Sequence, residues 1–225
     1  MIKRKKVEIN NDIFCNMHAI ISFVLHSIID NTINLGTLLV VVTLTLIHWV
    51  YCHTISLYIP LFFACIYFAA ALEESYHIAM IVLLGKQNSI SYIEITKIKI
   101  GAVTFIGGAS VCYKGMFKKS DIFYISLAGP IMPLFYIFVF IILFVLISFF
   151  TNINALFIIK ILIGAAIAPM CALIPLNTEK YCSDGYKIKT FIKTNKISWK
   201  QTISAVTYTI KSMLSATIDM GKNTI

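Results

Sequence analysis

The segment 60–85 reads PLFFACIYFAAALEESYHIAMIVLLG and is apolar except for the polar run EESYH at residues 73–77. A carboxylate near mid-bilayer depth costs on the order of 3 kcal/mol, and this segment carries two of them. On a helix, Glu73 and His77 are four residues apart and share one face, with Glu74 about 100° round the axis. Polar groups placed at such a cost indicate a functional site in this segment.

The spacing of these residues is typical of a helical metal site. Two ligands at i and i+4 with a glutamate between them form the HExxH motif of zinc hydrolases, and here Glu73 takes the place of the first histidine. We expect one Zn²⁺ ion, with Mn²⁺ or Fe²⁺ as alternatives because a glutamate adds a hard oxygen ligand. An acidic helix end, or a carboxylate pair on a proton or ion path, is the competing interpretation of Glu73 and Glu74.

The composition predicts a membrane protein. Hydrophobic residues make up 59% of the 225-residue chain, and the mean hydropathy is +0.85. The net charge of +9 comes from lysines at the chain ends and in one loop, not from a basic face with interleaved aromatic residues. We therefore expect the lipid bilayer as a partner and no nucleic acid.

Charge and hydropathy together suggest a topology. Four segments are apolar enough to cross a membrane, at 35–52, 56–85, 122–150 and 155–176. If the basic regions are cytoplasmic, two crossings precede the lysine-rich loop, and both termini are cytoplasmic. The segment 13–29 then lies at the membrane surface as an amphipathic helix.

Two regions predict local structure beyond the spans. Segments 90–95 and 98–100 are rich in β-branched residues, and segment 102–106 lies between glycines, so a small sheet is expected within residues 86–120, with Gly107 and Gly108 in a turn. Gly129 and Pro130 should kink the third span or begin it afresh.

The predicted fold class is an all-α polytopic membrane protein with about four transmembrane helices, an interfacial N-terminal helix at about residues 12–30 and this small sheet. The chain forms a single membrane-embedded domain, residues 1–225, with a cytoplasmic tail at 189–225.

From about Ile55 to Ile188, the chain resembles the site-2 protease family of intramembrane zinc metallopeptidases. Four features occur in the family's order: the EESYH run in place of HExxH, a strand-rich loop with two glycines, Leu127-Ala128-Gly129-Pro130, and Ser183-Asp184-Gly185. A single AGP or DG motif carries little weight, and the ordered set carries more. The chain departs from the family at Glu73 and in the stretch before Asp184, where the family's usual asparagine has only a loose counterpart, Asn177.

The resemblance implies a role for each matched residue. Glu73, His77 and Asp184 would bind the metal, and Glu74 would be the catalytic base that takes a proton from water. Asn177, Gly107 and Gly108 would contact a substrate that adds to the sheet as a strand. The remaining matched residues would have structural roles: Gly129, Pro130 and Gly185.

The predicted function is an intramembrane metalloprotease of a bacterial cell membrane that cleaves a peptide or a membrane-protein segment near the cytoplasmic face. Maturation of a secreted or bacteriocin-like peptide is one such reaction. A catalytically inactive relative that binds or regulates a membrane protein is the main alternative, and an ion pathway is another. A glutamic membrane peptidase would need the pattern EExxxR, and Ile78 occupies the arginine position.

Overall fold

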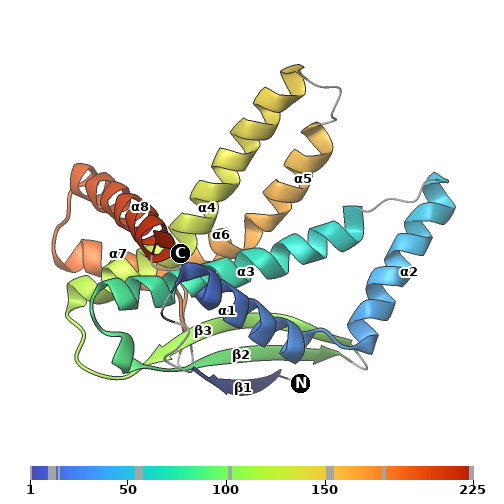
Figure 1. Cartoon of the computed structure of the whole chain (residues 1–225). Coiled ribbons are helices and arrows are strands. Elements are labelled where there is room, and N and C mark those ends of the chain that lie inside the picture. The colour runs from blue at the N-terminus through green and yellow to red at the C-terminus, as the bar shows by residue number, and fades with distance from the viewer. Residues whose placement is uncertain are drawn as a thin grey trace.

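The computed structural model describes residues 2–9, 14, 16–53, 58–100, 103–150, 155–178 and 181–222. These residues form a mostly helical molecule with one three-stranded sheet (Figure 1). The helices are α1 (Met17–Thr32), α2 (Leu35–Cys52), α3 (Tyr58–Leu83), η2 (Gln87–Ser89), α4 (Lys119–Phe150), α5 (Ala155–Ala165), α6 (Ile167–Leu173), α7 (Asp184–Thr194) and α8 (Trp199–Lys222). The strands are β1 (Ile2–Glu8), β2 (Ile90–Ile100), β3 (Val103–Tyr113) and the short pair β4 (Asn177–Thr178) and β5 (Tyr181–Cys182).

The sheet lies beneath α1 and α3 and packs against both (Figure 1). Its order is β1-β2-β3, and both neighbouring pairs are antiparallel. Because successive residues of a strand point to opposite faces, Ile93 and Ile95 point together and are fully buried. The expected sheet is therefore present, but its first strand comes from the basic N-terminus. That strand was not predicted, since the run Lys-Arg-Lys-Lys at 3–6 has no alternating apolar pattern.

The two glycines of the loop do not form the predicted turn. Gly107 and Gly108 lie inside β3, where Thr96 pairs with Gly108 and Lys97 pairs with Ile106. This register leaves Gly107 as the extra residue of a β-bulge, a position that glycine fills without a side chain to pack. The turn expected at Gly101 lies outside the described residues.

Helix α1 packs into the molecule by one face. Met17, Ile20, Val24 and Ile28 recur at three- and four-residue intervals and are buried against α3 and the sheet. The amphipathic helix expected at 13–29 is thus present from residue 17, with its apolar face in the protein core. Helix α2 follows at an angle of 86° to α1.

Helix α3 is the central element of the fold, because it contacts α1, α4, α5 and the sheet. Pro60 lies in its first turn, where the missing N–H costs no internal hydrogen bond, so no separate half-helix forms there. The helix ends where Gly85 adopts a left-handed conformation with φ +69°, and Lys86 N–H then donates to the Ile81 carbonyl.

Helix α4 runs unbroken through Pro130 and Pro133, so no new helix begins at Pro130. Its C-terminal part rises beside α5, away from the sheet (Figure 1), and exposes large apolar side chains such as Phe138, Phe140 and Leu146. Surfaces of this kind are stable in lipid and unfavourable in water.

The last predicted span, 155–176, is divided into α5 and α6 at Ala166. Pro169 has no N–H to donate to the carbonyl four residues earlier, and this loss favours a break in the helix. Within the described residues, α3 and α4 are long and apolar enough to cross a membrane, and the bent pair α1–α2 would be a third such element. These helices are consistent with a membrane location.

The predicted tail is largely helical and packed. Residues 189–222 complete α7 and form α8, and α8 buries Thr209, Met213 and Ala216 against the other helices. The packed unit therefore extends well beyond Ile188.

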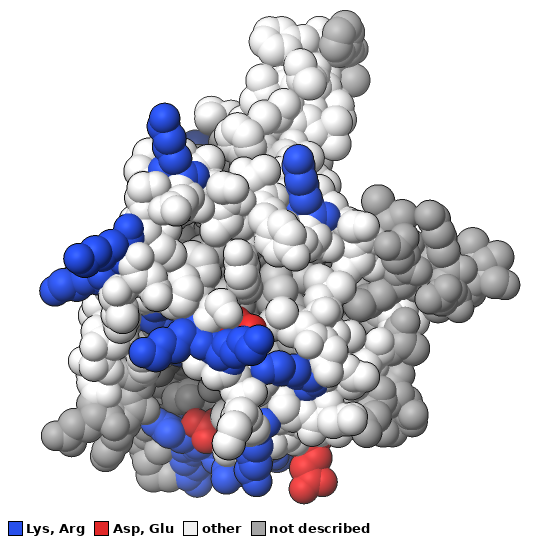
Figure 2. Space-filling model, turned by 90° about the vertical axis from the view of Figure 1, so that its left-hand side faces the viewer, with Lys and Arg blue, Asp and Glu red and all other residues white. Residues whose placement is uncertain are grey.

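The charged side chains are unevenly distributed. Figure 2 shows the face carrying α7 and α8: the uppermost part, formed by the end of α4, is white, whereas blue side chains gather in the middle and at the bottom, where β1 lies. This separation of an apolar part from a basic part is typical of a protein that contacts both lipid and an aqueous or anionic surface.

The β1–β2 register can be tested by cross-linking. Lys6 is paired with Glu94, so cysteines at these two positions should form a disulfide on oxidation when the six native cysteines are changed to alanine. Mass spectrometry of the digested protein identifies the linked peptides. The matched pair is Lys5→Cys with Glu94→Cys, whose side chains point to opposite faces; equal cross-linking of both pairs would contradict the register.

Candidate metal centre

Three ionisable side chains from two distant parts of the chain meet in the interior. Glu73 and His77 come from α3, and Asp184 comes from the first turn of α7. Each offers one ligand atom, and these atoms lie within 4.8 Å of one another. Side chains more than 100 residues apart are thus brought to one point, as the sequence predicted for Glu73, His77 and Asp184.

The His77 ring is held in one orientation by α4. Its Nδ1 lies 2.7 Å from the Ile125 carbonyl oxygen. Because a carbonyl only accepts hydrogen bonds, Nδ1 carries the proton and donates it. The other ring nitrogen, Nε2, lies 3.1 Å from Asp184 Oδ2. This is the arrangement of a metal-binding histidine, whose second nitrogen is fixed by a backbone carbonyl.

Gly129 gives the His77 ring its space. A methyl group at Gly129 would overlap the ring atoms Nε2, Cε1 and Cδ2. Pro130 follows directly and is fully buried in α4. The absence of a side chain at Gly129 therefore lets α4 pack directly against His77. This contact is the structural role of Gly129.

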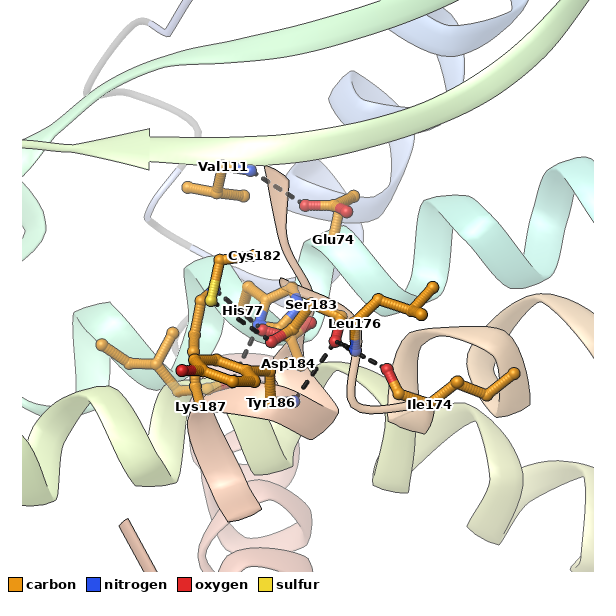
Figure 3. A network of polar contacts seen from close by, with 11 residues as sticks. Glu74, His77, Val111, Ile174, Leu176, Cys182, Ser183, Asp184, Tyr186 and Lys187 are labelled. Atoms are coloured by element: carbon orange, nitrogen blue, oxygen red, sulfur yellow. Dashed lines mark hydrogen bonds and ion pairs between the residues drawn. The ribbon is translucent and has the colours of Figure 1, made fainter. Parts of the chain in front are cut away.

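Asp184 is positioned by the way α7 begins. Ser183 is the N-cap of α7, and its hydroxyl accepts a hydrogen bond from Tyr186 N–H and donates one to the Ile174 carbonyl at 2.6 Å (Figure 3). Gly185 is buried so close to the Leu173 carbonyl that a side chain would overlap it. These contacts fasten the start of α7 to the end of α6 and so fix Asp184.

The charge of Asp184 is stabilised by its neighbours. Lys187, one turn later on α7, places Nζ 3.1 Å from Asp184 Oδ1. Burial alone would raise the pKa of Asp184, but His77 and Lys187 outweigh burial and hold this pKa well below its usual range. Asp184 is therefore a carboxylate at neutral pH.

Glu74 points to the sheet rather than to His77. Its Oε2 accepts a hydrogen bond of 3.0 Å from the backbone N–H of Val111 in β3 (Figure 3). Since β3 is the edge strand of the sheet next to α3, this N–H would otherwise be free for another strand. The carboxylate of Glu74 thus lies between the metal-binding group and the open edge of the sheet.

The three groups enclose a cavity of about 70 Å³ that also borders Glu74, Val111, Tyr113, Cys182 and Lys187. Among its described lining residues, three carboxylates face Lys187 and His77, and a buried excess of negative charge is costly unless a cation offsets it. Tetrahedral zinc bonds of 2.0–2.1 Å place ligand atoms about 3.3 Å apart, close to the 3.1 Å between Nε2 and Oδ2. The donor set, one imidazole nitrogen and carboxylate oxygens, suits zinc and also Mn²⁺ or Fe²⁺.

The substrate contacts predicted for Asn177, Gly107 and Gly108 stay predictions. Asn177 is exposed and paired with Cys182 in the short β4–β5 hairpin, and the part of β3 that lines the cavity begins at Ala109, beyond Gly107 and Gly108.

Four contacts of the site were not predicted from the sequence. Lys187 carried a detectable signal, since a lysine three residues after an aspartate on a helix is placed for an ion pair. The carbonyl of Ile125 and the N–H of Val111 act through the backbone, and their side chains give no indication of it. Cys182 lines the cavity, and its place two residues before Asp184 is the signal in the sequence that could have found it.

Comparisons with protein-family models, with curated proteins and with solved structures find no match to this chain.

The role of Gly129 predicts a mutational effect. Gly129→Ala should displace the His77 ring and lower zinc retention by at least about tenfold, because the histidine can no longer face Asp184. Zinc content is measured by mass spectrometry of the purified protein. Gly164→Ala is the matched variant, since its methyl group would meet the Phe62 ring instead. Equal zinc loss in both variants would contradict a specific role for Gly129.

Proposed function

We propose that this protein is an intramembrane metalloprotease of the site-2 protease type that cleaves a peptide or a membrane-protein segment near the cytoplasmic face. The single observation that carries the proposal is the convergence of Asp184 on Glu73 and His77. An acidic helix end would need no histidine oriented by a backbone carbonyl and no aspartate delivered from another helix. A hydrolytic metal site needs both.

A metal ion held by Glu73, His77 and Asp184 would polarise the scissile carbonyl and make a water molecule more acidic. The protein's own residues supply the rest. Glu74 is the group adjacent to the metal ligands that can take a proton from that water and pass it to the leaving amine. The Ile125 carbonyl keeps His77 in the tautomer that leaves Nε2 available. Gly129 and Gly185 allow the two helices to approach closely enough to form the site.

The edge of β3 is the proposed place for the substrate. An extended peptide that adds a strand at this edge would pass Ala109, Ser110 and Val111, which line the cavity. A strand pairing at Val111 would compete with Glu74 for the same N–H. Substrate binding would therefore release the Glu74 carboxylate toward the cavity at the moment a peptide bond arrives there.

The proposed topology has four spans, formed by α2, α3, α4 and the pair α5–α6, with both termini in the cytoplasm. The basic residues of β1, the loop after α3 and α7–α8 would then share one side of the membrane. The EESYH run lies in the C-terminal half of α3, toward that basic side.

An inactive, metal-binding relative is the second candidate. The observation that favours it is Glu73, because a second carboxylate in place of a histidine makes the centre less positive and a weaker Lewis acid. Such a protein would retain the metal and the β3 edge but would bind or regulate a membrane protein without cutting it.

Two variants distinguish metal binding from catalysis. Glu74→Gln should keep zinc at the wild-type level but slow cleavage by about 10²–10⁴-fold, because glutamine keeps the shape but cannot take a proton. His77→Ala should lose both zinc and cleavage. The measurement combines zinc content with mass spectrometry of products from a library of transmembrane peptides. Unchanged cleavage in Glu74→Gln would refute the protease, and zinc without cleavage in the wild type would favour the inactive relative.

The topology is tested by labelling intact cells with a membrane-impermeant thiol reagent in a cysteine-free background. A cysteine at Asn152 in the connection 151–154, which lies outside the described residues, should be labelled from outside. Cysteines at Lys118 and Lys193 should react after the membrane is opened. Labelling of either lysine position in intact cells would overturn the four-span arrangement.

A further inference from the structure

Lys187 has an arrangement that the protease proposal does not by itself require. Among the described residues that line the cavity, it carries the one ammonium group, against the carboxylates of Glu73, Glu74 and Asp184. Its Nζ lies 3.1 Å from Asp184 Oδ1, while Asp184 Oδ2 lies 3.1 Å from His77 Nε2. One carboxylate oxygen of Asp184 thus faces Lys187, and the other faces His77.

The lysine is held in this place by its position on α7. Lys187 and Asp184 are three residues apart on one helix, and Ser183 and Gly185 fasten the start of that helix. Tyr113 and Cys182 also border the same cavity. The ammonium group of Lys187 therefore forms an ion pair with Asp184 at the border of the cavity.

A count of formal charges shows what this lysine does. A divalent ion with Glu73, Asp184, Glu74 and a neutral His77 has a net charge of −1, from +2 and three carboxylates. With Lys187 the sum is 0. A centre with histidine in place of Glu73 would reach 0 without the lysine. The charge that Lys187 adds equals the charge that Glu73 removes.

We propose that Lys187 is a positioning residue that offsets the extra negative charge of Glu73 and keeps Asp184 bound to the metal through one oxygen. The inference rests on the proposed metal centre and deepens it. Lys187 draws electron density from Asp184, so the ion stays positive enough to act on a carbonyl. The Glu-for-His change is therefore compensated within this chain, which favours the active enzyme over the inactive relative.

The direction in which zinc affinity changes separates this role from one in which Lys187 only holds Asp184 in place. Lys187→Met removes a positive charge close to the ion, so zinc affinity should rise by at least about tenfold, while the cleavage rate falls. If Lys187 only holds Asp184 in place, the same variant should bind zinc more weakly. Zinc affinity is measured by competition with a chelator of known affinity.

Three further variants complete the test. Lys187→Arg keeps the charge and should retain wild-type zinc affinity within a few-fold. Glu73→His combined with Lys187→Met restores the net charge and keeps a ligand at position 73, so its affinity should return close to the wild-type value. Lys189→Met, at an exposed position of α7 outside the cavity lining, controls for a general change in charge and should leave zinc affinity unaltered.

The outcomes separate the two proposals. If wild-type protein binds zinc and Lys187→Met binds it equally or more weakly, the metal centre stands and the charge-balancing role of Lys187 is wrong. If wild-type protein binds no zinc, the proposed function fails and the role of Lys187 fails with it. Tighter zinc binding by Lys187→Met, reversed by Glu73→His, supports both.

Discussion

The structure depends on one electrostatic constraint: three carboxylates and a histidine lie together among tightly packed helices. Isolated charges of this kind cost several kcal/mol each in an apolar interior. Glu73 and Glu74 cannot move away from one another, because they are neighbours on α3, and α3 is fixed by packing on almost every side. The molecule therefore has to bring compensating groups to them. Lys187 pairs with Asp184, the Ile125 carbonyl accepts a hydrogen bond from His77, and the Val111 N–H donates one to Glu74; these partners come from α7, α4 and β3.

The rest of the fold holds these groups in place. The apolar face of the sheet, which includes Ile93 and Ile95, packs against α1 and α3. This packing places the edge of β3 beside Glu74. Helix α4 passes close to the histidine because Gly129 has no side chain. The exposed apolar surfaces of α2 and of the C-terminal part of α4 do not line the cavity, so the surfaces suited to lipid are separate from the candidate metal centre.

The sequence predicted those residues of the site whose side chains form a recognisable chemical pattern. A charged run in an apolar helix is visible in the sequence, so Glu73, Glu74 and His77 were identified from spacing, and Asp184 followed from a family resemblance. The β-bulge at Gly107 and the short hairpin that begins at Asn177 were not predicted, because both depend on strand pairing that local sequence does not encode. Strand β1 was missed for a similar reason: its stability comes from its partner β2, and its charged residues blunt an exposed edge. The division of the last apolar segment at Ala166 was signalled by Pro169, whose effect on the helix the span count did not consider.

The central claim is that one ion is bound by nitrogen and oxygen ligands from α3 and α7. X-ray absorption at the zinc edge of the purified, zinc-loaded protein measures that ligand set directly. We expect a first shell of nitrogen and oxygen atoms at about 2.0–2.2 Å with the outer-shell signature of a single imidazole. The signature of the imidazole should disappear in His77→Ala. A sulfur ligand at about 2.3 Å, which would come from a cysteine such as Cys182, or a shell without imidazole would contradict the assignment of Glu73, His77 and Asp184.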